Sequence, residues 1–186
     1  MILHHEDIKG VILSATSGDP GLLRRIGYLI ASWECKKKGI KHRSKLLTRL
    51  SFGNFNREFR PNRTEFDWLS RDDSEVDKYI ADPFCGGTFT AGFFRDILYG
   101  IGEINKRDNI EKIPKDLPIF VISGEKDPMG KKTKSVKQVI HDFHKAGISR
   151  VSSKFYTGAR HELLNETNRE EVIQDIVTWL QEQITE

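Results

Sequence analysis

Two side chains in the last third of the sequence have the types and spacing of an acid–base pair. Asp127 lies in SGEKDPMG and His161 lies in TGARHELLNE, and each follows a short apolar run. A carboxylate that accepts a hydrogen bond from one imidazole nitrogen fixes the tautomer of the ring. The other nitrogen is then free to take a proton from a nucleophile. These residues are therefore candidates for the base and the orienting acid of nucleophilic catalysis.

A simpler interpretation fits the same two residues. Asp127 directly precedes Pro128, which is typical of a residue that starts a turn. His161 precedes an apolar, helix-forming stretch and could cap a helix there. The spacing by itself leaves both the catalytic and the structural interpretation open.

Three apolar runs bounded by turn residues predict the strands that would position these loops. They cover residues 10–15, 117–123 and 151–156. Runs that are apolar on both faces are typical of buried parallel strands. The third run alternates more and is expected nearer an edge of the sheet. Asp127 and His161 would then follow two strands at the same edge, where open α/β sheets keep their reactive groups.

Helical patterns surround and separate these strands. Residues 22–38, 44–51, 73–81 and 90–105 are predicted helices between the first two strands. A further helix carries an apolar stripe with Gly147 after its end, and a last helix begins after Asn168, with Glu171 completing a capping box. The stripes are Val136, Val139, Ile140 and Phe143 in the first, and Val172, Ile173, Ile176, Val177, Leu180 and Ile184 in the second.

These patterns predict an α/β protein with a parallel sheet of about three strands. Residues 1–18 would form a core strand and turn, residues 19–112 a helical cap or lid, and residues 113–186 a βαβα part of the core. Ninety residues of helix exceed what a strand crossover needs, which indicates an insertion.

Composition excludes several other classes. The 186 residues carry a net charge of +3 with both signs intermixed, so a nucleic-acid partner is not expected. No run approaches the ~20 apolar residues of a membrane span, and Cys35 and Cys85 lack metal or redox spacing. We predict a cytoplasmic protein, with contact at a membrane surface left open, and no metal or organic cofactor.

The segments LPIFVISGEKDPMG and FYTGARHELLNETNREEVIQDIVTWL resemble the carboxyl-terminal part of α/β-hydrolase serine hydrolases. The similar group is the lysophospholipase and monoacylglycerol-lipase-like set, also called serine aminopeptidase S33 or Hydrolase-4. GVILSATSGDP resembles the strand before that family's lid, and residues 52–90 resemble the lid. The resemblance implies a partial α/β-hydrolase fold, with Asp127 as triad acid and His161 as triad base.

The nucleophile elbow of that family, G-x-S-x-G, is absent from the chain. Ser14, Ser17 and Ser123 lie near strand ends but lack the strained turn that makes an elbow serine reactive. We therefore expect the carboxyl-terminal half of a longer enzyme, inactive and prone to aggregate by itself, with the missing amino-terminal half as its partner.

The resemblance implies hydrolysis of lipid-like carboxylic esters. Five aromatic residues of the predicted lid are candidates for contact with an acyl chain, although packing explains most of them equally well. These are Phe52, Phe55, Phe59, Phe66 and Trp68. Two alternatives remain: a short non-catalytic binding protein derived from a hydrolase, and a peptidase or amide hydrolase of the same fold.

Overall fold

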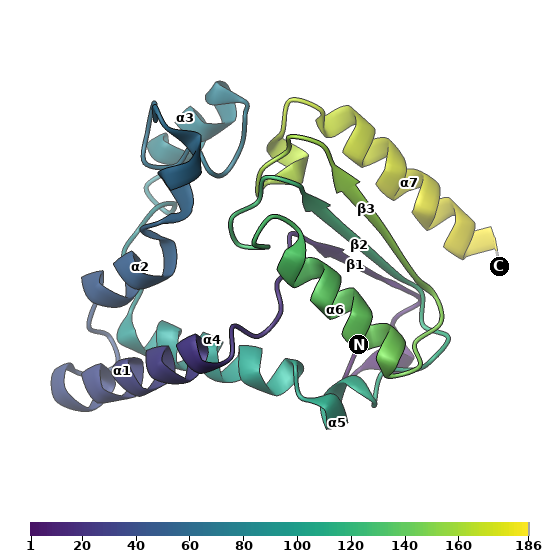
Figure 1. The fold of residues 1–186 in the computed structure, drawn as a ribbon, viewed down its shortest axis with the longest axis horizontal. Coiled ribbons are helices and arrows are strands. Elements are labelled where there is room, and N and C mark those ends of the chain that lie inside the picture. Colours follow the sequence, from purple (N-terminus) through teal and green to yellow (C-terminus); the bar gives the residue numbers. More distant parts are fainter. Residues whose placement is uncertain (186) are drawn as a thin grey trace.

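Three parallel strands form the sheet of this protein (Figure 1). The computed structural model describes residues 1–185. The strands are β1 (Val11–Ser14), β2 (Ile119–Gly124) and β3 (Val151–Tyr156), and they lie in the order β1-β2-β3. Ile12 pairs with Phe120, and Ile119 pairs with Val151. The predicted class, α/β with a three-stranded parallel sheet, is confirmed, and β3 lies at an edge of the described sheet.

The remaining elements are helical. Between β1 and β2 lie α1 (Leu22–Lys38), α2 (Lys45–Phe52), the 3-10 helix η2 (Phe55–Phe59), α3 (Asp73–Ala81), α4 (Ala91–Ile104) and α5 (Arg107–Ile110). We call this helical segment between the two strands the insertion. Outside it lie η1 (His5–Asp7), α6 (Lys134–Lys145), η3 (Leu163–Asn165) and α7 (Arg169–Thr185). Within residues 1–185, no helix is long and apolar enough to cross a membrane.

The central strand β2 is buried along its whole length, and its side chains alternate between two cores. Ile119 and Val121 pack in the cluster that α6 covers. Phe120 and Ile122 pack on the opposite face, in the cluster that α7 covers. This alternation is the period of two that a strand imposes. The sheet is therefore enclosed between α6 and α7, as the continuous apolar run of β2 predicts.

The helix α6 follows the predicted stripe. Val136, Val139 and Phe143 are buried against the sheet, and Ile140 packs partly against the same cluster. Gly147 has a φ of +86°, the left-handed conformation in which glycine commonly ends a helix.

The buried face of α7 differs from the prediction. Val172 and Trp179 are buried, and Ile176 packs partly against them, whereas the other four predicted members are exposed. The exposed fractions are 41% for Ile173, 40% for Val177, 41% for Leu180 and 83% for Ile184. The Trp179 ring stacks on Phe120 at 5.7 Å between centroids, which turns that stripe of the helix toward the sheet. The predicted single face was therefore wrong, because two apolar stripes are present and the described sheet covers one.

The predicted capping box of α7 is also replaced by other contacts. Asn168 does precede the helix, but its side-chain oxygen accepts a hydrogen bond from Arg71 at 2.6 Å. Its amide nitrogen donates to the carboxylate of Glu171 at 2.9 Å. The two residues thus meet side chain to side chain, and the first turn is tied to the insertion.

The insertion has a small core of its own. α1 and α4 pack along each other, and Ala31, Leu47 and Phe94 form the buried cluster between α1, α2 and α4. Ser44 and Thr90 cap α2 and α4 by accepting N–H groups of the first turn. Because a cap residue is only half helical, both helices begin one residue after the predicted start. In Figure 1 the helices α1 to α4 extend to one side of the sheet.

Candidate active site

The two predicted site residues lie in contact at the carboxyl edge of the sheet. Asp127 lies in the loop after β2, and His161 lies in the loop after β3. Nδ1 of His161 is 3.0 Å from Oδ2 of Asp127. A carboxylate only accepts hydrogen bonds, so Nδ1 carries the proton and donates it. Within residues 1–185 the other ring nitrogen has no hydrogen-bond partner, and it is the one available to accept a proton.

Asp127 also forms a turn, as the simpler interpretation predicts, and its carboxylate contacts His161 at the same time. Its side chain is fully buried. Oδ1 accepts the backbone N–H of Met129 at 2.8 Å, while Oδ2 faces the imidazole. The turn thus fixes the carboxylate that receives His161. The capping interpretation of His161 is wrong, because η3 begins at Leu163 with no side-chain cap and α7 begins only at Arg169.

Close packing of the two loops places this pair. The N–H of Lys126 donates to the carbonyl of Ala159 at 2.9 Å, and the N–H of Glu125 donates to the carbonyl of Tyr156 at 3.1 Å. The approach requires a glycine at position 124, because a Cβ there would lie 2.1 Å from the carbonyl oxygen of Arg160. A residue without a side chain at the end of β2 therefore allows the two loops to meet.

The loop that carries His161 is also joined to the helical insertion by Glu166. This carboxylate is fully buried and accepts the N–H of Arg160 at 2.7 Å. It also accepts the side chain of Arg71 at 2.7 Å, and Arg71 precedes α3 in the insertion. The N–H of Glu162 donates to the carbonyl of Leu69 at 2.8 Å. Glu166 is thus a positioning residue that binds both sides of this junction.

Arg160 also joins the loop that carries His161 to the insertion. Its guanidinium donates to the carbonyls of Asp67 and Ser70, the latter at 2.9 Å, and lies over the ring of Phe59 at 4.3 Å. Burial lowers the pKa of Arg160, and the carboxylates of Glu166 and Asp67 oppose this shift. Sequence reasoning missed Glu166, Arg71 and Arg160, because isolated charges in a loop carry no periodic signal.

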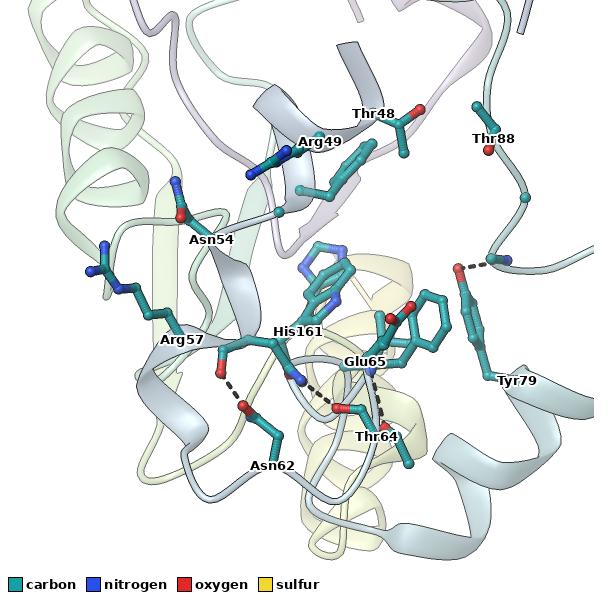
Figure 2. A pocket seen from close by; sticks show the side chains of 18 of the residues that line it. Thr48, Arg49, Asn54, Arg57, Asn62, Thr64, Glu65, Tyr79, Thr88 and His161 are labelled. Carbon is teal, nitrogen blue, oxygen red and sulfur yellow. Dashed lines mark hydrogen bonds between the residues drawn. The ribbon is translucent and has the colours of Figure 1, made fainter. Parts of the chain in front are cut away.

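A cavity of about 1100 Å³ opens beside His161 (Figure 2). Three of the five aromatic candidates, Phe52, Phe66 and Trp68, line it. Trp68 lies against the imidazole, with 5.2 Å between the ring centroids. Phe55 and Phe59 are not among the residues that line the cavity. Phe55 packs edge-on against Trp68 at 5.0 Å, and Phe59 lies under the guanidinium of Arg160. The cavity is therefore built largely from the insertion, with the histidine at its boundary.

The structure does not bring a serine to the histidine. Ser14 is exposed at the end of β1, Ser17 lies in the following turn, and Ser123 is buried in β2. In the described part of the chain, none of these serines forms a hydrogen bond with His161. Within residues 1–185, no group of three or more His, Cys, Asp or Glu side chains is arranged to hold a metal ion.

A parallel sheet with an Asp–His pair at its carboxyl edge, and with a helical insertion between two of its strands, is the arrangement of an α/β-hydrolase. Here that fold is partial. The chain belongs to the Hydrolase_4 family, serine aminopeptidase S33, whose family model matches residues 1–168.

Solved structures agree with this assignment of the fold. A highly thermostable carboxyl esterase from Bacillus coagulans, in complex with glycerol, matches with a TM-score of 0.88 and 24% identity over 98% of this chain and 59% of that chain. A soluble variant of monoglyceride lipase from Saccharomyces cerevisiae, bound to a substrate analog, matches with a TM-score of 0.65 and 18% identity over 97% and 58%. A monoacylglycerol lipase from Paleococcus ferrophilus matches with a TM-score of 0.61 and 18% identity over 95% and 60%. The chain spans about three fifths of the length of these proteins.

Proposed function

We propose that Asp127 and His161 are the acid and base of a Ser-His-Asp triad that hydrolyses carboxylic esters, and that the serine lies outside these 186 residues. The observation that carries the proposal is the hydrogen bond of 3.0 Å between His161 Nδ1 and a fully buried carboxylate, beside a cavity. Membership of a hydrolase family supports it. The neighbouring folds include a carboxyl esterase and monoacylglycerol lipases.

The serine is the nucleophile, His161 transfers the proton, and Asp127 orients His161. The serine oxygen attacks the ester carbonyl carbon as its proton passes to Nε2 of His161. The imidazolium, stabilised by Asp127, then returns that proton to the leaving alcohol as the acyl–serine ester forms. Water repeats the sequence: it gives a proton to Nε2, attacks the acyl carbonyl, and the serine leaves with the proton restored. Asp127 keeps its charge throughout and holds the tautomer.

The insertion acts as the lid in this proposal. Trp68 and Phe66 give the cavity an apolar wall next to the imidazole, which suits an acyl chain and reduces water near the reacting carbon. The volume of about 1100 Å³ lies slightly above the range of roughly 300–1,000 Å³ that is ordinary for small-molecule sites. A lipid-like ester is therefore the substrate class that the site favours over a peptide.

The test is an esterase assay on an extended polypeptide, which includes the residues encoded by any in-frame sequence found upstream of Met1. We expect hydrolysis of p-nitrophenyl esters, with a rate that depends on acyl length, and no hydrolysis by residues 1–186 alone. His161→Ala should lower kcat by at least about a thousandfold, because the base is lost. His141→Ala, an exposed histidine on α6, is the matched control. Full activity of the His161 variant, or of residues 1–186 alone, would contradict the proposal.

A further inference from the structure

The cavity beside His161 has a strongly basic side. Lys45 and Arg49 come from α2, and Arg57 and Arg60 come from η2 and the residue after it. We call these four residues the cationic rim. All four are exposed. Within residues 1–185, none of the four forms an ion pair or a side-chain hydrogen bond.

This lack of partners sets the rim apart from the arginines around it. Arg63 pairs with Asp77 at 2.7 Å, Arg71 pairs with Glu166, and Arg169 pairs with Asp72 at 2.9 Å. Even Glu58, which lies between two rim residues in the sequence, pairs instead with Lys132 at 3.0 Å. Lys45 and Arg49 are four positions apart on one helix, an arrangement of like charges that destabilises a helix. Uncompensated charges at a cavity are typical of a site that binds an anion.

The cavity is not neutralised by its acidic residues. Glu65 and Glu162 are the two acidic residues among the residues that line it, and both keep their charge, since the hydrogen bond that Glu162 accepts at 2.8 Å comes from the neutral side chain of Asn165. Figure 2 shows Arg49, Asn54 and Arg57 on one side of His161 and Glu65 on the other. Four cations against two carboxylates leave the cavity with a net positive charge, concentrated away from Glu65. The charge is therefore asymmetric across the site.

Resting on the proposed function, we propose that the ester hydrolysed here carries an anionic group, a phosphate or a carboxylate, which the cationic rim binds. The aromatic wall takes the acyl part, and the rim takes the charged end. Arginine suits this role because its planar donors bind phosphate and carboxylate oxygens in pairs. Asn54, whose side chain makes no hydrogen bond within residues 1–185, lies with Arg49 and Arg57 and offers a further donor.

A binding experiment on the 186-residue chain tests this without any hydrolysis. Isothermal titration calorimetry would compare octyl phosphate, octanoate and octanol below their aggregation concentrations. We expect at least one anionic probe to bind about tenfold more tightly than octanol, with the preference falling as salt is added. Tighter binding of octyl phosphate identifies a phosphate group, and tighter binding of octanoate identifies a carboxylate. Equal binding of all three probes, or tighter binding of octanol, would overturn the inference.

Variants locate the effect on the rim. Arg49→Gln with Arg57→Gln should weaken the anionic probe about tenfold and leave octanol unchanged. The matched control removes two cations of α1 that lie outside the cavity and form no ion pair within residues 1–185, Arg25→Gln with Lys37→Gln, and should change neither. Circular dichroism would verify that the variants fold. An equal loss in the control pair would show a general charge effect and reject the rim.

A kinetic measurement separates this inference from the proposed function. In the extended polypeptide, the rim variant should raise KM for an anionic ester about tenfold, with kcat and the values for a neutral ester unchanged. Hydrolysis of neutral esters without this preference rejects the rim and keeps the triad. Anion binding by the rim without any ester hydrolysis rejects the triad and keeps the rim.

Discussion

Gly124 and Arg160 meet backbone to backbone, so closely that a Cβ on Gly124 would lie 2.1 Å from the carbonyl oxygen of Arg160. This approach holds together the loops that carry Asp127 and His161. Gly124→Ala should therefore destabilise the protein by about 3 kcal/mol, because the backbone has to move. It should also lengthen the contact between Asp127 and His161. Urea unfolding measures the first effect, and the imidazole NMR signals of His161 report the second.

Gly100→Ala is the matched control for this substitution. A Cβ at Gly100 meets nothing within 4 Å, and the residue lies inside α4. Alanine favours a helix interior over glycine, so the control should gain up to about 1 kcal/mol. Similar losses in the two variants would show that the contact with Arg160 does not matter.

Asp127→Asn separates the turn from the histidine contact. Asparagine keeps an oxygen for the N–H of Met129, but its amide nitrogen would face Nδ1 of His161 and favour the wrong tautomer. We expect nearly native stability, a shift of His161 to the Nε2–H tautomer in nitrogen NMR spectra, and a fall in kcat of about 10⁴-fold in the extended polypeptide. Asp127→Ala should lose stability as well, because the turn also loses its acceptor. An unchanged tautomer in the asparagine variant would contradict the orienting role.

Glu166→Gln tests the junction between the histidine loop and the insertion. The change leaves the Arg71 guanidinium without its buried counter-charge, which should cost about 3 kcal/mol of unfolding free energy. Glu170→Gln, at an exposed neighbour, should cost little. Hydrogen exchange should rise in residues 157–167 and 67–72 together, since Glu166 connects the two segments. Faster exchange in one segment alone would argue against a shared anchor.

Asp72 predicts an acid-dependent loss of stability. Hydrogen bonds from Ser74 and Arg169 lower the pKa of Asp72 from 3.8 to about 2. The folded state therefore binds this proton less tightly than the unfolded state, and the stabilisation is complete above about pH 4. It is lost as the pH falls through 2. Asp72→Asn should flatten this part of a stability profile measured by urea unfolding, whereas Asp108→Asn should leave it unchanged. Parallel profiles for Asp72→Asn and the native chain would refute the linkage.

The outer stripe of α7 predicts self-association. Val177 and Leu180 are 40% and 41% exposed beside Ile173 and Ile184, so the helix presents an apolar face without a partner in the described chain. Sedimentation velocity of residues 1–186 should show concentration-dependent association, and Val177→Lys with Leu180→Glu should reduce it. Gln174→Lys with Glu182→Lys on the polar surface is the control. Monomers at all concentrations would contradict this prediction.

The sheet and the contact between Asp127 and His161 were predictable because both depend on local patterns. An apolar run such as that of β2 identifies a buried parallel strand, and parallel strands deliver their carboxyl ends to one edge. Asp127 and His161 therefore had to emerge side by side, although their separation of 3.0 Å could not be derived.

Contacts that depend on how the elements pack against one another were not predictable. Which stripe of α7 is buried is set by the stacking of Trp179 on Phe120, and the sequence offers seven apolar positions in this helix without ranking them. Glu166 and Glu162 look alike in the sequence, yet the first is buried among donors and the second faces the cavity. Only the fold separates them.

The junction built by Glu166 and Arg160 restricts which parts of this chain can move independently. A rigid displacement of residues 67–72 would pull the imidazole of His161 away from Asp127. We therefore expect these residues to stay in place when other parts of the insertion move. Within residues 1–185, no hydrogen bond joins α1, α2 or α4 to the loop that carries His161, so these helices can move without displacing it. Bending of these helices would therefore leave the contact between Asp127 and His161 intact.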